Sequence, residues 1–455
     1  MTTRGHLAAP ELPDALIATY DVAGPRYTSY PTVPVWSTAF GAEAYAIALR
    51  EAGRDAHPLA LYAHFPYCSA KCRYCGCNAL VTQKTATVER YLDDLQRELD
   101  LVVAHLGAGR RAVQLHWGGG TPNVMTDAQI RRAFHLFADR FDLVREAELS
   151  VEADPRHVTP SQLETLRALG FDRISFGVQD LDPAVQEAIG RVQPEGMVRE
   201  VVDWSRAAGF TGINIDLIYG LPRQTVGSFT RTMATALALD PDRVATFGYA
   251  HMPSQRAHQR LIHDDDLPSP ATRAALFQLA VATFTGAGYA WLGLDHFAKA
   301  ADPLAAAQRD GVLHRNFMGY TTMPGQHLIG VGMSAISEVA GRFAQNAPGI
   351  AAWREAVTAG RFPTVRGHRL TDDDLLRQRA IMHLMCNGEL PYELAPMPAA
   401  ETRRVYARFA ADGLVTLEPN RLLVTPLGRF FLRNLCMELD AHLTRETAGR
   451  FSRTV

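Results

Sequence analysis

Residues 64–80 read HFPYCSAKCRYCGCNAL and hold four of the six cysteines of this 455-residue chain. The first three, Cys68, Cys72 and Cys75, follow a short apolar run that predicts a β-strand over 59–64. Three thiolates on one short loop can each bind an iron of a [4Fe–4S] cluster and leave the fourth iron an open coordination site. A structural zinc site is the alternative, but zinc usually takes two separated cysteine pairs and no second pair follows downstream. We therefore expect an iron–sulfur cluster on these three residues.

Outward from this loop, short apolar runs alternate with amphipathic stretches. The apolar runs predict strands at 59–64, 113–117, 148–152, 173–178, 213–218 and 245–250. The amphipathic stretches predict helices at 88–104, 127–140, 160–170, 183–190, 196–208 and 226–239. Strands that alternate with helices are typical of an α/β fold with a parallel sheet. We expect a partial (β/α)6 barrel, although a doubly wound sheet has almost the same periodicity.

Four segments are expected along the chain. Residues 1–55 form an N-terminal extension that covers the active site, with a loop rather than a helix at GPRYTSYPT (24–32). Residues 56–300 form the barrel, with a further strand at 289–294, and 301–364 form a connecting segment that closes the site. Residues 365–455 form a mostly helical domain. Its helices at 371–387 and 398–412, a strand pair within 413–428 and a closing helix at 428–444 resemble a winged helix, for which a scaffolding role is favoured over DNA binding.

Composition and charge exclude several classes of protein. Hydrophobic residues make up 47% and charged residues 21%, and the formal net charge is −2, so nothing global attracts nucleic acid or an anionic membrane. Neither a signal peptide nor a membrane-spanning segment is predicted, and we expect a cytoplasmic monomer without membrane insertion. Cys386 and Cys436 stand alone in apolar helical sequence and are expected to be buried core thiols.

Glycines and polar residues stand where the predicted strands end. The segment LHWGGGTP (115–122) has three glycines, which allow the backbone to approach a ligand closely. Glu152, Gln179 and Asp216 lie at the ends of later strands, where barrels gather their ligand-binding groups. Each could satisfy a structural hydrogen bond instead, but matching positions on successive strands favour a binding site. Arg191, in AIGRVQ, is harder to assign because a solvated surface charge explains it equally well.

These motifs together resemble a known family. The cysteine loop after the first strand is similar to that of the radical S-adenosylmethionine (SAM) superfamily, and LHWGGGTP resembles its SAM-binding segment. Within the superfamily, the chain resembles the oxygen-independent coproporphyrinogen III oxidases almost from end to end. The shared segments are GPRYTSYPT, the cysteine loop with its extra Cys77, QLHWGGGTP, VEADPR, GVQD, NIDLIYGLP, YAHMP, DHFA, LHRNFMGYTT and TPLGRFFLRNLCM.

The resemblance implies a radical SAM barrel with two SAM molecules near one cluster. The SAM on the open iron would contact Tyr62, Gly119, Glu152 and Ile336. The second SAM would contact Tyr74, Gly120, Thr121, Gln179, Arg191, Asp216 and Ala250. Cys77 is a possible neighbour of the cluster, and Met318 receives no role because its position varies in the family.

The implied reaction is the oxidative decarboxylation of two propionate side chains of coproporphyrinogen III, which gives protoporphyrinogen IX in anaerobic haem biosynthesis. The resemblance also implies a one-electron reductant such as a flavodoxin or a ferredoxin. Because the substrate carries four carboxylates, basic partners are needed despite the near-zero net charge. Arg26, His314 and Arg315 are candidates, with ordinary salt bridges as the alternative for each.

Other proteins share this scaffold. A haem chaperone would bind haem without decarboxylation, but such relatives usually lack the fourth cysteine and the YTSYP segment that are present here. The same two features disfavour a haem-degrading radical methyltransferase. A structural zinc protein would leave Glu152, Gln179 and Asp216 unexplained.

Overall fold

The computed structural model describes residues 10–323, 325–444 and 451–454 and is built around one twelve-stranded sheet. The sheet has the order β16-β15-β14-β13-β1-β4-β5-β6-β7-β8-β10-β9. Six successive strands form its parallel centre: β1 (Leu59–Phe65), β4 (Arg110–Gly119), β5 (Phe141–Ala153), β6 (Arg173–Gln179), β7 (Gly212–Tyr219) and β8 (Arg243–Gly248). All six predicted strands are confirmed.

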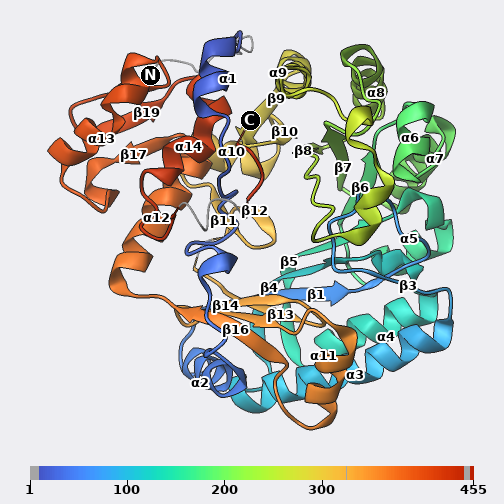
Figure 1. The fold of residues 1–455 in the computed structure, drawn as a ribbon. Coiled ribbons are helices and arrows are strands. Elements are labelled where there is room, and N and C mark those ends of the chain that lie inside the picture. The colour runs from blue at the N-terminus through green and yellow to red at the C-terminus, as the bar shows by residue number, and fades with distance from the viewer. Residues whose placement is uncertain (1–9, 324, 445–450, 455) are drawn as a thin grey trace.

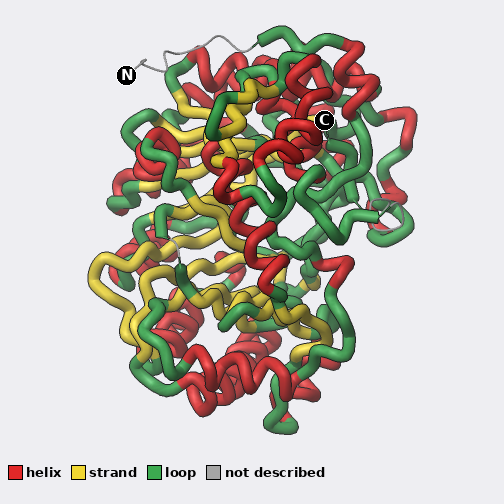
Figure 2. Tube along the Cα trace, turned by 90° about the vertical axis from the view of Figure 1, so that its left-hand side faces the viewer, coloured by secondary structure: helices red, strands yellow, loops and turns green. Residues whose placement is uncertain are grey.

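The order of these strands distinguishes the two expected folds. A doubly wound sheet reverses its strand order at a switch point, whereas the six central strands keep their sequence order in space. The connecting helices are α3 (Thr85–Leu106), α4 (Asp127–Ala138), α5 (Pro160–Ala168), α6 (Pro183–Ile189), α7 (Glu195–Ala208) and α8 (Val226–Ala238). Figure 1 shows them along the outer side of a curved sheet, and Figure 2 shows strands above a layer of helices at the base. The partial barrel is therefore confirmed.

Alternation along β7 explains how the barrel carries polar groups inside. Ile213, Ile215 and Leu217 are fully buried, whereas Asn214 and Asp216 line an interior cavity. Successive side chains of a strand point to opposite faces, so the apolar set meets the helices and the polar set faces inward. The connecting helices begin at local signals, such as the capping box of Thr126 and Gln129 at α4.

Further strands extend both edges of the sheet. β13 (His327–Val331) pairs parallel with β1 and is followed by antiparallel β14 (Ile336–Val339), β15 (Arg342–Asn346) and β16 (Thr364–Arg369). At the other edge lie β10 (His296–Lys299) and β9 (Tyr289–Gly293), the latter being the strand expected at 289–294. The segment 301–364 therefore contributes strands to the sheet. The remaining elements of this half are β2 (Tyr67–Cys68), β3 (Leu80–Val81), α9 (Pro270–Gly286), α10 (Pro303–Arg309), β11 (His314–Asn316), β12 (Gly319–Thr321) and α11 (Ile350–Thr358).

The N-terminal segment links the C-terminal domain to the sheet. It contains α1 (Asp14–Tyr20) and α2 (Ala42–Ala52), and the predicted loop at 24–32 is confirmed. The Tyr27 hydroxyl donates to Asp440 at 2.9 Å, and the backbone N–H of Ala441 donates to the Tyr30 hydroxyl at 3.1 Å. Figure 1 shows this blue segment running from α1, beside the C-terminal helices, to α2 near the base of the sheet.

The C-terminal domain has the expected helices and strands, with one error. It contains α12 (Asp372–Asn387), α13 (Ala399–Ala411), a sheet of β17 (Glu389–Pro391), β19 (Arg421–Val424) and β18 (Val415–Leu417), and α14 (Leu432–Met437). The closing helix predicted over 428–444 is wrong, because a 3-10 turn precedes α14 and the helix ends at Met437. Asp440 accepts a hydrogen bond from the backbone N–H of His442 at 2.8 Å, a local bond that competes with helix continuation. The resemblance to a winged helix and the segment boundaries remain predictions.

None of the helices in the described part of the chain is both long enough and apolar enough to cross a membrane. Cys386 and Cys436 are buried, as expected.

Candidate active site

The four clustered cysteines line one cavity at the carboxyl ends of the central strands. Cys68 ends β2, and hydrogen bonds from Leu80 N–H to the Pro66 carbonyl and from Thr82 N–H to the Cys68 carbonyl close the loop. The cavity measures about 370 Å³, and we call it the thiol cavity. It brings the cysteines together with strand ends that are far apart in the sequence. Its lining includes Tyr74, Gly119, Gly120, Thr121, Glu152, Gln179, Arg191, Asp216 and Ala250.

The arrangement of the thiols fits an iron–sulfur cluster better than zinc. Among the described residues, no three cysteine sulfurs lie within 4.8 Å of one another. Tetrahedral zinc, with Zn–S bonds of about 2.3 Å, would hold its sulfurs about 3.8 Å apart. The Thr121 hydroxyl donates to the Cys68 sulfur at 3.2 Å, and the Cys77 N–H donates to the Cys75 sulfur at 3.4 Å. Such donors stabilise sulfur ligands and tune a cluster bound to them.

Cys77 lies beside the three thiols that are predicted to hold the cluster. A hydrogen bond from its thiol lowers the pKa of Cys75, and the same bond raises the pKa of Cys77. Burial raises the pKa of Cys68. The exposed Cys77 is therefore placed to donate to Cys75, and its role in the cluster remains a prediction.

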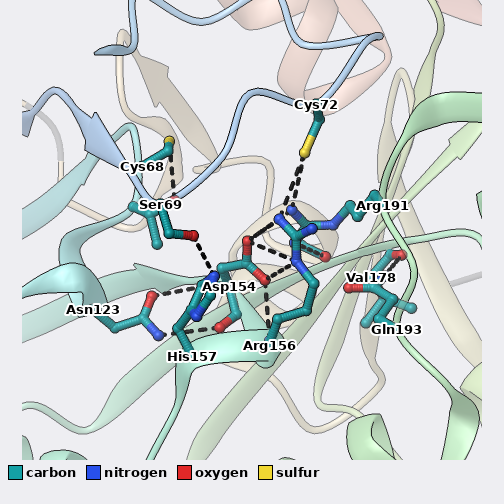
Figure 3. A network of polar contacts seen from close by, with 12 residues as sticks. Cys68, Ser69, Cys72, Asn123, Asp154, Arg156, His157, Val178, Arg191 and Gln193 are labelled. Atoms are coloured by element: carbon teal, nitrogen blue, oxygen red, sulfur yellow. Dashed lines mark hydrogen bonds and ion pairs between the residues drawn. The ribbon is translucent and has the colours of Figure 1, made fainter. Parts of the chain in front are cut away.

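Arg191 is buried at the floor of the thiol cavity. Its side chain is 7% exposed and forms an ion pair with Asp154 at 2.9 Å and a hydrogen bond to the Gly177 carbonyl at 2.6 Å. Arg156 pairs with the same carboxylate at 2.7 Å, and both guanidinium groups lie 3.6 Å from the Cys72 sulfur. Figure 3 shows the two arginines between Asp154 and Cys72. This burial excludes the surface-charge alternative for Arg191, and its Nε has no partner among the described residues.

At two positions of the segment 118–120, neighbouring atoms lie so close to the backbone that only glycine fits. Gly119 has φ of 108°, and a Cβ there would lie 2.5 Å from Nδ1 of His64. A Cβ on Gly120 would lie 2.7 Å from the backbone of Pro66. The backbone at 119 also donates to Glu152 at 3.1 Å. Glycines at these positions let the segment pack against the cysteine loop and still present its backbone to the cavity.

Glu152 and Asp216 are two carboxyl groups with opposite tendencies. Burial opposes ionisation of Glu152, but the hydrogen bond from His116, 3.5 Å away, and its charge hold the Glu152 pKa below its usual value. Burial, together with the charge of Glu152, raises the pKa of Asp216 to about 7. Ser175 and Asn214 donate to Asp216 at 3.0 and 2.7 Å. A pair of this kind keeps one carboxylate charged and makes the other responsive to a ligand.

A second cavity, of about 230 Å³, adjoins the thiol cavity at Glu152. Tyr62 and Ile336, which were expected with Glu152 at the first SAM, line it. His64, His116, Phe317 and Met318 line it as well and were missed as site residues. The Tyr62 ring stacks on His116 with centroids 5.9 Å apart, and its hydroxyl lies 3.0 Å from Nδ1 of His64. Alternation along β1 was the signal for His64, which faces the same side of the sheet as Tyr62.

The three candidate substrate residues occupy different surroundings. Arg26 forms an ion pair with the buried Asp295, and its guanidinium lies 5.9 Å from the centroid of the Phe247 ring. Arg315 donates to the Arg26 carbonyl at 3.3 Å and lies over Tyr320 at 5.2 Å. His314 is exposed and, with Arg315, lines a larger cavity of about 500 Å³.

Comparisons with known proteins agree with this geometry. The sequence pattern of the Radical SAM superfamily matches residues 62–236. An oxygen-independent coproporphyrinogen III oxidase of Escherichia coli (strain K12) is 43% identical over 452 residues, covering 97% of this chain and 98% of that protein. A protein of the same name from Pseudomonas aeruginosa is 39% identical, with the same coverage of both chains. The solved structure of coproporphyrinogen III oxidase (HemN) from Escherichia coli, described as a radical SAM enzyme, superposes with a TM-score of 0.89 at 41% identity. It covers 96% of this chain and 100% of that one.

Proposed function

The chain belongs to the radical SAM superfamily and, within it, to the oxygen-independent coproporphyrinogen III oxidases, and from this we propose its reaction. It converts two propionate side chains of coproporphyrinogen III to vinyl groups and gives protoporphyrinogen IX in anaerobic haem biosynthesis. The observation that carries this proposal is the single cavity that joins the three-cysteine loop to the glycine segment and the polar strand ends.

Cys68, Cys72 and Cys75 would hold a [4Fe–4S] cluster, and the open iron would bind SAM. When bound, the cluster and SAM supply the one-electron chemistry that removes a propionate hydrogen too weakly acidic for a general base. We propose that the backbone at Gly119 and the Glu152 carboxylate bond the charged end of SAM, with Tyr62 and Ile336 along the adjoining wall.

We propose a second SAM in the thiol cavity. Its lining has the apolar and polar groups that a nucleoside with an amino-acid tail needs, namely Tyr74, Gly120, Thr121, Gln179, Arg191, Asp216 and Ala250. Asp216 suits a ribose hydroxyl, because a carboxyl group with a pKa near neutrality accepts such a bond on ionising. Equilibrium dialysis of the reconstituted protein should give two SAM per chain, and about one for Gln179→Ala. One SAM in the unmodified chain would contradict the proposal.

We also propose the cellular compartment, the electron donor and the oligomeric state of the chain. None of the six cysteines, all of which lie in the described residues, is in a disulfide, which suits a reducing cytoplasm and a one-electron donor such as a flavodoxin or a ferredoxin. We propose that the chain acts as a monomer, which analytical ultracentrifugation of the reconstituted protein tests.

The reaction is tested anaerobically on the reconstituted protein. SAM, reductant and coproporphyrinogen III are added, and the products are oxidised and analysed for protoporphyrin. The expected result is two vinyl groups per substrate, with 5′-deoxyadenosine released alongside. Cleavage of SAM with an untouched porphyrinogen, and haem bound instead, would replace this function with that of a haem chaperone.

A further inference from the structure

The largest of the described cavities at this end of the barrel lies away from the cysteines. It measures about 500 Å³ and is bounded by α12, by β11 and by Thr28 and Ser29 of the N-terminal loop. We call it the α12 cavity. It shares Asn316 and Thr321 with a cavity of about 250 Å³ inside the barrel. That inner cavity shares Glu152 and Asp216 with the thiol cavity, so each neighbouring pair of cavities has a common wall.

The walls of the α12 cavity carry cationic and polar groups that lack partners. Arg379 is exposed at the wall and has no hydrogen bond or ion pair within the described ranges. Nε of Arg315 and both amide atoms of Gln326 are buried without hydrogen bonds among the described residues, whereas Nε2 of His383 lies 3.8 Å from Glu389. Buried polar groups cost free energy unless they are paired, so this concentration indicates a missing polar ligand.

The charge of the cavity indicates the sign of that ligand. Glu338 is the one carboxyl group among the described lining residues, and burial raises its pKa. Gln378 donates to it at 2.9 Å. Two guanidinium groups, of Arg315 and Arg379, therefore face a wall with little negative charge of its own, which suits an anion.

Two of the residues that line the α12 cavity lie on the same face of α12. Arg379 and His383 are four residues apart on α12 and so lie on one face of that helix. Arg315 faces them from β11. The guanidinium groups of Arg379 and Arg315, on two different elements, can each bind a carboxylate with two hydrogen bonds.

We propose that the α12 cavity binds propionate carboxylates of the tetrapyrrole that are not reacting, with Arg379 as their principal partner. The identity of the ligand as a tetrapyrrole rests on the proposed function. Four carboxylates on one macrocycle cannot all reach the cluster, so those far from it need cations elsewhere. Arg26 is less suited to this task because Asp295 already neutralises it.

Binding is measured with coproporphyrin III, a stable porphyrin with the same four propionates, by fluorescence titration of the reconstituted protein. Arg379→Gln should weaken binding about tenfold, as expected for one charge-assisted pair. Arg404→Gln is the matched control, because Arg404 is an exposed helical arginine near Glu401 that lines none of these cavities. The tetramethyl ester of coproporphyrin III should bind Arg379→Gln and the unmodified protein equally, since it has no carboxylates.

The inference is overturned if Arg379→Gln binds coproporphyrin III as tightly as Arg404→Gln does, or if the ester shows the same tenfold difference. Arg379→Lys, which keeps the charge, should recover part of the affinity. The KM for coproporphyrinogen III should rise in parallel in Arg379→Gln, with the iron content unchanged. If the unmodified protein binds the porphyrin through Arg379 but forms no vinyl groups, the proposed function fails while the carboxylate site stands.

Discussion

The thiol cavity and the α12 cavity differ in whether their charged side chains are paired with other protein groups. In the thiol cavity Arg191 and Arg156 share Asp154, and Glu152 lies beside His116. In the α12 cavity Arg379 has no charged partner within the described chain. Paired groups are held in place before a ligand arrives, which suits reactive cofactors that need fixed positions. Unpaired cations are satisfied by the ligand itself, which suits a charged substrate that must enter and leave.

The largest expected effect removes the thiol cavity's function and leaves the α12 cavity intact. Cys72→Ala removes one of the three proposed cluster ligands, so turnover of coproporphyrinogen III should fall to background and the iron content should drop sharply. Iron and sulfide analysis together with the anaerobic assay measure both. The matched variant is Cys77→Ser, which should keep the iron content, since three other thiols suffice. If Cys77→Ser lost its iron and Cys72→Ala did not, Cys77 would be the cluster ligand and the assignment of Cys72 would be wrong.

A second variant tests whether pairing in the thiol cavity serves the ligand or only the fold. Arg191→Met removes a buried cation from Asp154 and from the Gly177 carbonyl, so SAM affinity should fall about tenfold and the melting temperature should drop. Arg156→Met disturbs the same carboxylate from a residue outside the predicted SAM set. Calorimetric titration with SAM compares the two. Equal losses would mean that Arg191 acts through Asp154 and not through SAM.

Arg26 provides an intermediate case between the paired Arg191 and the unpaired Arg379. Its ion pair with Asp295, whose pKa it holds well below the usual range, resembles the thiol cavity more than the α12 cavity. Arg26→Ala should therefore raise the KM for coproporphyrinogen III about threefold, less than Arg379→Gln, with the cluster intact. Asp295→Asn should have a similar effect if the pair acts by holding the N-terminal loop. A larger effect of Arg26→Ala than of Arg379→Gln on KM would reverse the assignment.

The smallest expected effect is a pH dependence of stability. The pKa of Asp216 is about 7 in the folded chain and near the ordinary value of 3.8 in the unfolded chain, so the folded state binds more protons between these two pH values. Stability therefore falls as the pH rises from about 4 to 7. Asp216→Asn removes this loss and can keep the bonds to Ser175 and Asn214, so without SAM its melting temperature should exceed that of the unmodified chain by about 2 °C at pH 8. Scanning calorimetry at pH 5 and pH 8 measures the difference, which should be clearly smaller at pH 5.

The thiol cavity was predictable because its parts are local. The spacing of Cys68, Cys72 and Cys75, the glycines at the end of β4, and the polar residues near the ends of β5, β6 and β7 are each visible in a few residues. A parallel barrel brings all such ends to one edge. The strands themselves followed from apolar periodicity. The SAM contacts assigned to single residues came from the family resemblance and not from the pattern.

The α12 cavity was not predictable, because it exists only through tertiary contacts. Thr28 is hundreds of residues from Arg315 and Arg379 in the sequence. In addition, nothing in the sequence around Arg379 distinguishes it from an ordinary solvated arginine on a helix. The same cause explains the wrong end of the closing helix. The turn after Met437 is stabilised by Asp440, which also binds Tyr27 of the N-terminal loop.

The central claim is that chemistry and carboxylate recognition belong to separate cavities. One titration series of coproporphyrin III into the unmodified protein, Cys72→Ala and Arg379→Gln tests this claim directly, with iron content measured on each sample. We predict that Cys72→Ala loses iron but binds the porphyrin within about twofold of the unmodified chain, whereas Arg379→Gln keeps its iron and binds about tenfold more weakly. Loss of porphyrin binding in Cys72→Ala, with full binding in Arg379→Gln, would contradict the claim.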